Sequence, residues 1–100
     1  MANSLIRRLV LDVLKPYDPE INLVATMVLE KSKKSKIDGV NITVYEMDRL
    51  TQKVKVIIQG IGLDYEEIND ILISINCIVH SVDQVVAGET IVEDIDTPQD

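Results

Sequence analysis

The sequence contains few residues that carry specialised chemistry. Its 100 residues include no Phe, no Trp and a single Cys, and the aromatic side chains are three Tyr. Because a lone Cys77 cannot form an internal disulfide, it is typical of a protein from a reducing compartment. Without Phe or Trp, the core of a folded domain must be built from Ile, Leu and Val.

Long apolar runs are also missing. No run approaches the roughly 20 residues that a membrane-spanning helix needs. The first residues lack the basic segment, apolar segment and small-residue site of a signal peptide. We therefore expect a cytoplasmic protein with no membrane partner, and its length suits one domain rather than two.

Positive charge is scarce, since 10 Lys and Arg face 17 Asp and Glu, for a net charge of −7. Four of the acids lie in residues 93–100, which contain no base. We therefore predict a single domain over residues 1–92, followed by an acidic tail over 93–100. An acidic surface repels phosphate backbones, which argues against nucleic acid as a partner.

The apolar pattern predicts six secondary-structure elements. Alternating apolar residues predict strands over 5–14, 40–45, 54–59 and 77–86, and Gly60 and Gly62 are expected to break the sheet. Helical spacing predicts one helix that opens at Asp18 and ends by residues 38–39, and a second that Asp64 caps, with Glu67 in a capping-box position. The order β-α-β-β-α-β predicts an α+β fold of ferredoxin-like type. It is a sandwich of a four-stranded antiparallel sheet with two helices on one face.

The other face of this sheet is expected to be polar. We regard Arg8, Asp12, Tyr45 and His80 as candidate ligand or interface residues. His80 is expected to be partly buried, and on a regular strand it would point away from Ser81, so the two could not act as base and nucleophile. We therefore predict no catalytic residue and no enzyme activity.

The known uses of this fold require groups that the sequence lacks. The loop after the first strand has no Arg to hold phosphate, as an acylphosphatase-like enzyme needs. One Cys cannot form the two-thiolate site of a metallochaperone. The central strands also lack the aromatic residues on which an RNA-recognition motif stacks bases.

Three segments carry a family resemblance. Residues 7–16 (RRLVLDVLKP), 38–48 (DGVNITVYEMD) and 78–88 (IVHSVDQVVAG) resemble an archaeal family of uncharacterised proteins, domain of unknown function 211. The resemblance spans roughly residues 5–92. It implies a ferredoxin-like fold, an archaeal cytoplasmic origin and ring-like homo-oligomers, and it supplies no activity.

Four carboxylates are candidate metal ligands: Glu46 and Asp48 at the end of the second strand, and Asp83 and Glu89 at the end of the fourth. We expect these two strands to run the same way, so that the acids share one end of the sheet on opposite edges. In a ring joined edge to edge, they would then meet across each boundary and hold Ca²⁺ or Mg²⁺. The alternative is a solvated acidic surface with Asp83 paired to Arg8.

Self-association is expected because neither edge strand contains an internal Pro to block pairing. Leu23 and Met27 widen the apolar stripe of the first helix beyond what one sheet contact needs. We predict a homo-oligomeric binding or assembly module. The alternative is an ACT-like regulatory domain that senses amino acids, although Pro16 and Pro19 remove amide donors from the loop that such domains use.

Overall fold

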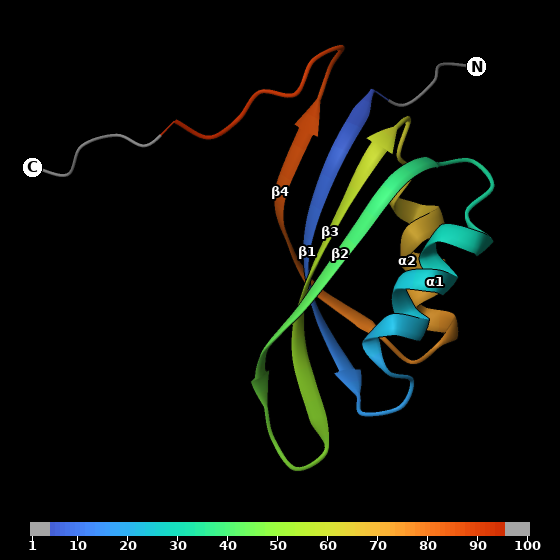
Figure 1. Cartoon of the computed structure of the whole chain (residues 1–100), viewed down its shortest axis with the longest axis vertical. Helices are drawn as coiled ribbons and strands as arrows, with labels where there is room; N and C mark the ends of the chain where they lie inside the picture. Colours follow the sequence, from blue (N-terminus) through green and yellow to red (C-terminus); the bar gives the residue numbers. More distant parts are fainter. Residues whose placement is uncertain (1–4, 96–100) are drawn as a thin grey trace, which may run out of the picture.

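The computed structural model describes residues 5–95 and confirms the predicted order of elements (Figure 1). The elements are β1 (Ile6–Pro16), α1 (Ile21–Lys31), β2 (Lys36–Met47), β3 (Thr51–Ile61), α2 (Tyr65–Ser74) and β4 (Ile78–Ala87). The strands form one sheet in the order β2-β3-β1-β4, and every neighbouring pair is antiparallel. Both helices lie on the same side of this sheet (Figure 1). The fold is therefore the ferredoxin-like α+β sandwich, with β1 and β3 central.

The core lies between the sheet and the two helices and is aliphatic, as predicted. Alternate residues of β1 and β3 point toward the helices, and each helix contributes one buried stripe. Burying one such side chain contributes about 1.5–3 kcal/mol. The most deeply buried apolar residues are Leu9, Leu11, Val13, Val24, Val28, Val54, Val56, Ile58, Leu63, Ile68, Leu72 and Cys77.

The boundaries of α1 differ from the prediction. The N-cap is Glu20, without a side-chain hydrogen bond, so the predicted cap at Asp18 is wrong. Asp18 lies two residues before the N-cap, joined to Pro19 by a cis peptide bond, and is too early to reach the free amides of the first turn. The helix ends at Lys31, and residues 38–39, which were expected to end it, lie inside β2.

Gly60 does not break the sheet, because β3 continues to Ile61. A Cβ atom at Gly60 would overlap the carbonyl oxygen of Lys36 and lie 2.9 Å from Cα of Ile37 on β2. The glycine therefore permits a close approach of two backbones within the sheet. The prediction is therefore wrong for Gly60, whereas β3 does end directly before Gly62, whose φ is 66°.

The start of α2 is joined to the loop between α1 and β2. Asp64 caps the helix by accepting from the Glu67 amide at 3.0 Å, as predicted. The Glu67 carboxylate makes no reciprocal capping bond and accepts instead from the amides of Lys33, Lys34 and Ser35, at 2.7, 2.8 and 2.8 Å. Burial alone would raise the pKa of Glu67, but these amides outweigh burial and lower it to about 2.

Lys15 is a fully buried cation at the end of β1. Its Nζ donates to the carbonyl of Pro16 and to Oε1 of Gln52, both at 2.7 Å, and to the carbonyl of Tyr17 at 3.4 Å. Burial lowers the pKa of Lys15, and burial also raises the pKa of the neighbouring Cys77 thiol. Both side chains are enclosed, which suits a structural role.

The helices are short. Over residues 5–95, neither helix has the length and apolar character needed to cross a membrane.

Candidate functional site

The face of the sheet opposite the helices, which we call the open face, carries two adjoining hollows. The first has a volume of about 540 Å³. The second has a volume of about 420 Å³, and both are lined in part by Lys55 and Asp83. The first is lined by Arg8, Val10, Lys55, Ile57, Gln59, Asp83 and Gln84. The second is lined by Asp12, Thr43, Tyr45, Lys55 and Asp83.

A β-bulge places His80 on this face. Val79 pairs with Val13 and Ser81 pairs with Asp12, which leaves His80 as an extra residue in β4. Such an extra residue changes the direction of a side chain relative to regular alternation. His80 is exposed and lines a hollow of about 160 Å³ together with Asp12. The expectations that His80 is partly buried and that it points away from Ser81 are therefore wrong.

A second β-bulge in β4 places Asp83 on the open face. Val82 pairs with Leu11 and Gln84 pairs with Val10, so Asp83 is the extra residue. It lines both hollows of the open face.

Together the two bulges change the period of β4. The open face carries the side chains of His80, Ser81, Asp83 and Gln84. The side chains of residues 79, 82 and 85 lie on the helix side, as do those of their β1 partners. Four polar residues of one edge strand are thereby brought to one surface.

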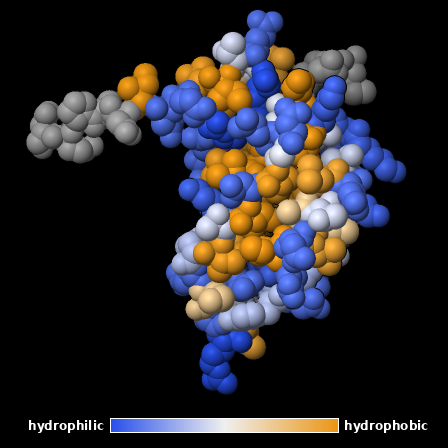
Figure 2. Space-filling model, viewed as in Figure 1, coloured by the Kyte–Doolittle hydropathy of each residue, from blue (hydrophilic) through white to orange (hydrophobic). Residues whose placement is uncertain are grey.

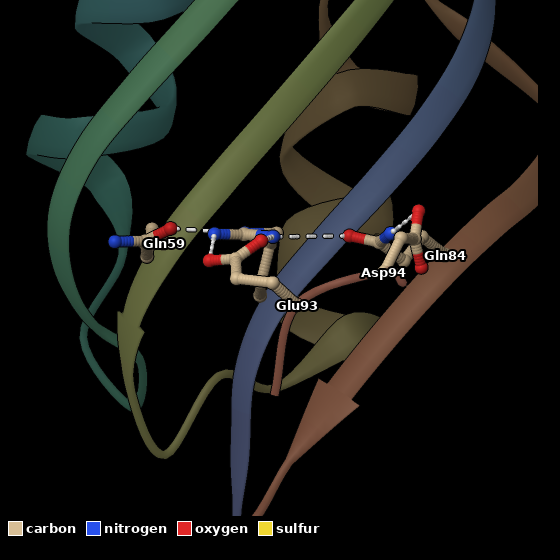
Figure 3. A network of polar contacts seen from close by, with 5 residues as sticks. Gln59, Gln84, Glu93 and Asp94 are labelled. Atoms are coloured by element: carbon tan, nitrogen blue, oxygen red, sulfur yellow. Dashed lines mark hydrogen bonds and ion pairs between the residues drawn. The ribbon is translucent and has the colours of Figure 1, made fainter. Parts of the chain in front are cut away.

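Arg8 is the centre of a polar network on the open face, and Figure 3 labels the other four members, Gln59, Gln84, Glu93 and Asp94. Its Nε donates to Oε1 of Gln59 at 2.9 Å, and Nη1 donates to Oε1 of Gln84 at 3.3 Å. Nη1 and Nη2 also donate to the two carboxylate oxygens of Glu93, at 3.0 and 2.9 Å. Gln84 in turn donates to Asp94 at 3.2 Å. The bonded carboxylate of Glu93 raises the pKa of Arg8, and Arg8 lowers the pKa of Glu93.

The acidic segment therefore begins on the sheet. Glu93 and Asp94 contact the open face, although both belong to the segment 93–100 that was predicted as a separate tail. Residues 96–100 of that segment lie outside the described part of the chain. The carboxylate paired with Arg8 is that of Glu93, and the alternative pairing of Arg8 with Asp83 does not form.

Asp12, Tyr45 and Lys55 occupy the middle of the open face. The Tyr45 hydroxyl donates to the Asp12 carboxylate, and this bond raises the pKa of Tyr45 to about 12. Lys55 is the cross-strand neighbour of Asp12, and its exposed side chain has no hydrogen-bond or ion-pair partner among residues 5–95. Among residues 5–95, Lys55 is therefore a cation without a direct ion pair, although Asp12 and Asp83 line the same hollow.

The four predicted metal ligands do not lie at one end of the sheet. In the order β2-β3-β1-β4 all neighbours are antiparallel, so β2 and β4 run in opposite directions and the predicted common direction is wrong. Glu46 and Asp48 lie at one end, Asp83 near the middle of β4, and Glu89 beyond the other end. Glu46 is instead 3.6 Å from Lys53, its neighbour on β3.

Besides Glu46, two more of these carboxylates have partners within the chain. Asp48 accepts from the amides of Leu50 and Thr51 at 3.0 and 2.8 Å, and these bonds lower its pKa. Asp83 accepts from Ser81 at 2.6 Å. Over residues 5–95, no three His, Cys, Asp or Glu side chains are grouped so that they could hold a metal ion within one subunit.

The open face therefore presents charged and hydrogen-bonding groups beside hollows. Of the four candidates named from the sequence, Arg8 lines the first hollow, and Asp12 and Tyr45 line the second. His80 lies beside Asp12 at the smaller hollow. Sequence analysis missed the role of Glu93. A signal for it was present, because an acidic segment in a chain with few bases must find its cations among residues such as Arg8.

Comparison with known proteins agrees with the resemblance. The model of the DUF211 family, described as uncharacterized ArCR, matches residues 7–100 and so includes the acidic segment. An uncharacterized protein of Methanocaldococcus jannaschii is 53% identical over 95 residues, which cover 95% of each chain. The chain belongs to the DUF211 family.

Proposed function

We propose that the protein is a homo-oligomeric binding module whose subunits join through their edge strands. The observation that carries this proposal is the exposed apolar surface at both edges of the sheet. On β4, the exposed fractions of Ile78, Val82 and Val85 are 54%, 44% and 53%. On β2, those of Tyr45 and Met47 are 54% and 62%.

The directions of the edge strands suit a ring. In a closed ring every subunit has the same orientation along the axis, so β2 of one subunit would meet β4 of the next in antiparallel fashion. This is the arrangement of every pair within the sheet. Each boundary would pair two strands of 12 and 10 residues, whose outer backbone groups face solvent in a single subunit.

Apolar burial at the boundary supports the same proposal. Figure 2 shows hydrophobic side chains through the middle of the molecule, with further ones near its upper end. Covering Val82 and Val85 would contribute about 1–2 kcal/mol each, because both are already half covered in one subunit.

The test is the solution mass by light scattering. Wild type is expected to be an oligomer, and Val82→Lys is expected to shift the mass toward the monomer. Leu50→Lys is the matched control, because Leu50 is 79% exposed at the turn between β2 and β3, away from the length of both edges. A wild-type monomer, or equal masses for both variants, would contradict the proposal.

Binding of Ca²⁺ or Mg²⁺ between subunits stays a prediction. Because β2 and β4 run in opposite directions, a shared site would use some of Glu46, Asp48, Asp83 and Glu89 rather than all four. Light scattering in EDTA and in millimolar Ca²⁺ tests it, with calorimetry on wild type and Asp83→Ala. An oligomer that ignores both conditions, with no heat of Ca²⁺ binding, would remove the cation.

The second candidate is small-molecule sensing of the ACT-like kind. The open face favours it, since a hollow of about 540 Å³ presents two cationic groups and one carboxylate beside apolar residues. Small-molecule sites have this mixed character, with a few polar groups placed around an apolar floor.

A further inference from the structure

Arg8 is built to receive a carboxylate. Its side chain is only 16% exposed and is held between glutamines of the two neighbouring strands. With Nε and part of Nη1 fixed by Gln59 and Gln84, the remaining N–H groups point to both oxygens of one carboxylate. Bidentate pairing of this type is stronger and more directional than a single charged contact.

The carboxylate now on Arg8 comes from a solvent-exposed side chain outside the strands. Glu93 lies in the irregular segment after β4, and its side chain is 66% exposed. Solvent screens the exposed Glu93 side of this ion pair, so an external carboxylate that makes the same two bonds and also contacts the rest of the hollow can compete with it. The segment is anchored before this point, where the Gly88 amide donates to the carbonyl of Leu5 at 2.8 Å and Arg7 donates to the carbonyl of Glu89 at 2.5 Å. Release of Glu93 therefore leaves β4 in place.

The hollow beside Arg8 supplies the other contacts. Lys55 lies on the strand next to Arg8 and four residues along it, a separation of about 13 Å along the strand direction at 3.3 Å per residue, and both long side chains line the same hollow. The floor between them contains Val10 and Ile57, and Asp83 lies on the β4 side. Two cations and one carboxylate thus surround an apolar floor.

We propose that this hollow binds an acidic amino acid, a small molecule with two carboxylates and one ammonium group. One carboxylate replaces Glu93 on Arg8, the second contacts Lys55, and the ammonium contacts Asp83. The charges of the ligand are the reverse of those in the hollow. A phosphate ester without an amino group would suit Arg8 but offers no group for Asp83.

This inference deepens the second candidate function by naming a ligand class and a site. It does not depend on assembly, because every residue of the site comes from one subunit. Binding and mass are measured separately, so failure of one leaves the other standing.

The experiment is a titration of L-glutamate into ¹⁵N-labelled protein, followed by amide chemical shifts. Glu93→Gln removes the internal competitor and is expected to bind up to about fivefold more tightly than wild type. In the Glu93→Gln background, Lys55→Met is expected to weaken binding by about tenfold, because it removes one charged contact. Lys53→Met is the matched control, since Lys53 lies on the same strand outside the hollow.

Three results would contradict the proposal. Absence of shifts around Arg8 and Lys55 in Glu93→Gln at millimolar L-glutamate would overturn the proposal. Equal affinities of the Lys55→Met and Lys53→Met proteins would do the same. Glutarate has no ammonium group and is expected to bind more weakly than L-glutamate, and the difference is expected to vanish in Asp83→Asn. Equal binding of glutarate and L-glutamate to the protein that retains Asp83 would refute the assignment to amino acids.

Discussion

The carboxylate of Glu67 provides the sharpest test of how the fold is held together. It is the common acceptor for three consecutive amides of residues 33–35, so it fixes the loop between α1 and β2 against α2. Replacement by Gln preserves the size of the side chain. It removes the charge and turns one of the two acceptor oxygens into an NH₂ donor that faces other donors.

The expected loss follows from proton affinity. A pKa of about 2, against an ordinary value of 4.5, corresponds to about 3 kcal/mol of stability at neutral pH, since each tenfold change in proton affinity is worth about 1.4 kcal/mol. The carboxylate is partly exposed to solvent, which reduces the expected loss to about 2 kcal/mol. Glu67→Gln should therefore lower the free energy of unfolding by about 2 kcal/mol at pH 7.

The pH dependence gives this prediction its own signature. Because the folded pKa of Glu67 is depressed, its contribution is complete above pH 4.5 and is lost as the pH falls toward 2. The difference in stability between wild type and Glu67→Gln should therefore shrink over this range. Urea unfolding followed by circular dichroism at a series of pH values measures it.

Glu66→Gln is the control, because Glu66 is an exposed acid in the same turn of α2. It shares the favourable interaction with the helix dipole but contacts none of the loop amides. If Glu66→Gln costs as much as Glu67→Gln, or if the Glu67→Gln difference does not change with pH, the amides of residues 33–35 do not hold the charge as described.

Three other predictions follow from local geometry. Gly60→Ala should lower the free energy of unfolding by about 1–3 kcal/mol, and with it the melting temperature, because its Cβ would overlap a carbonyl of β2. Gly39→Ala has open space and should change the melting temperature little. Equal shifts for the two variants would contradict the close approach. Cys77 is buried and its pKa is raised, so a thiol reagent should modify it only as fast as the protein unfolds, and rapid modification of the native protein would refute its enclosure. Tyr45 should ionise near pH 12 in an ultraviolet titration and at lower pH in Asp12→Asn, and an unchanged midpoint would exclude their hydrogen bond.

Local patterns predicted the architecture because they have a fixed period. Leu9, Leu11 and Val13 alternate on a regular strand, and the structure buries all three. The stripe of α2 was predicted for the same reason. Leu23 is exposed as expected, at 48%, but Met27 packs against the core, since a flexible side chain can reach a gap that spacing alone does not reveal.

Contacts between distant segments account for what the sequence did not reveal. Glu67 has the spacing of a capping box, but a loop more than 30 residues away in sequence offers better donors than the helix start. Gly60 resembles a strand breaker until β2 is placed beside it. The candidate site depended on regular alternation in β4, which the extra residues His80 and Asp83 disrupt.

The bulges of β4 also bear on which strands this edge can accept. A flat, regular edge pairs with almost any extended segment, and this is a route to aggregation. An edge with extra residues at His80 and Asp83 is more strongly twisted, and its backbone groups lose their even spacing. The backbone donors and acceptors of a regular foreign strand would not align with those of β4. In the proposed assembly, the same irregularity that turns polar side chains to the open face would favour a neighbour whose own edge has a matching shape.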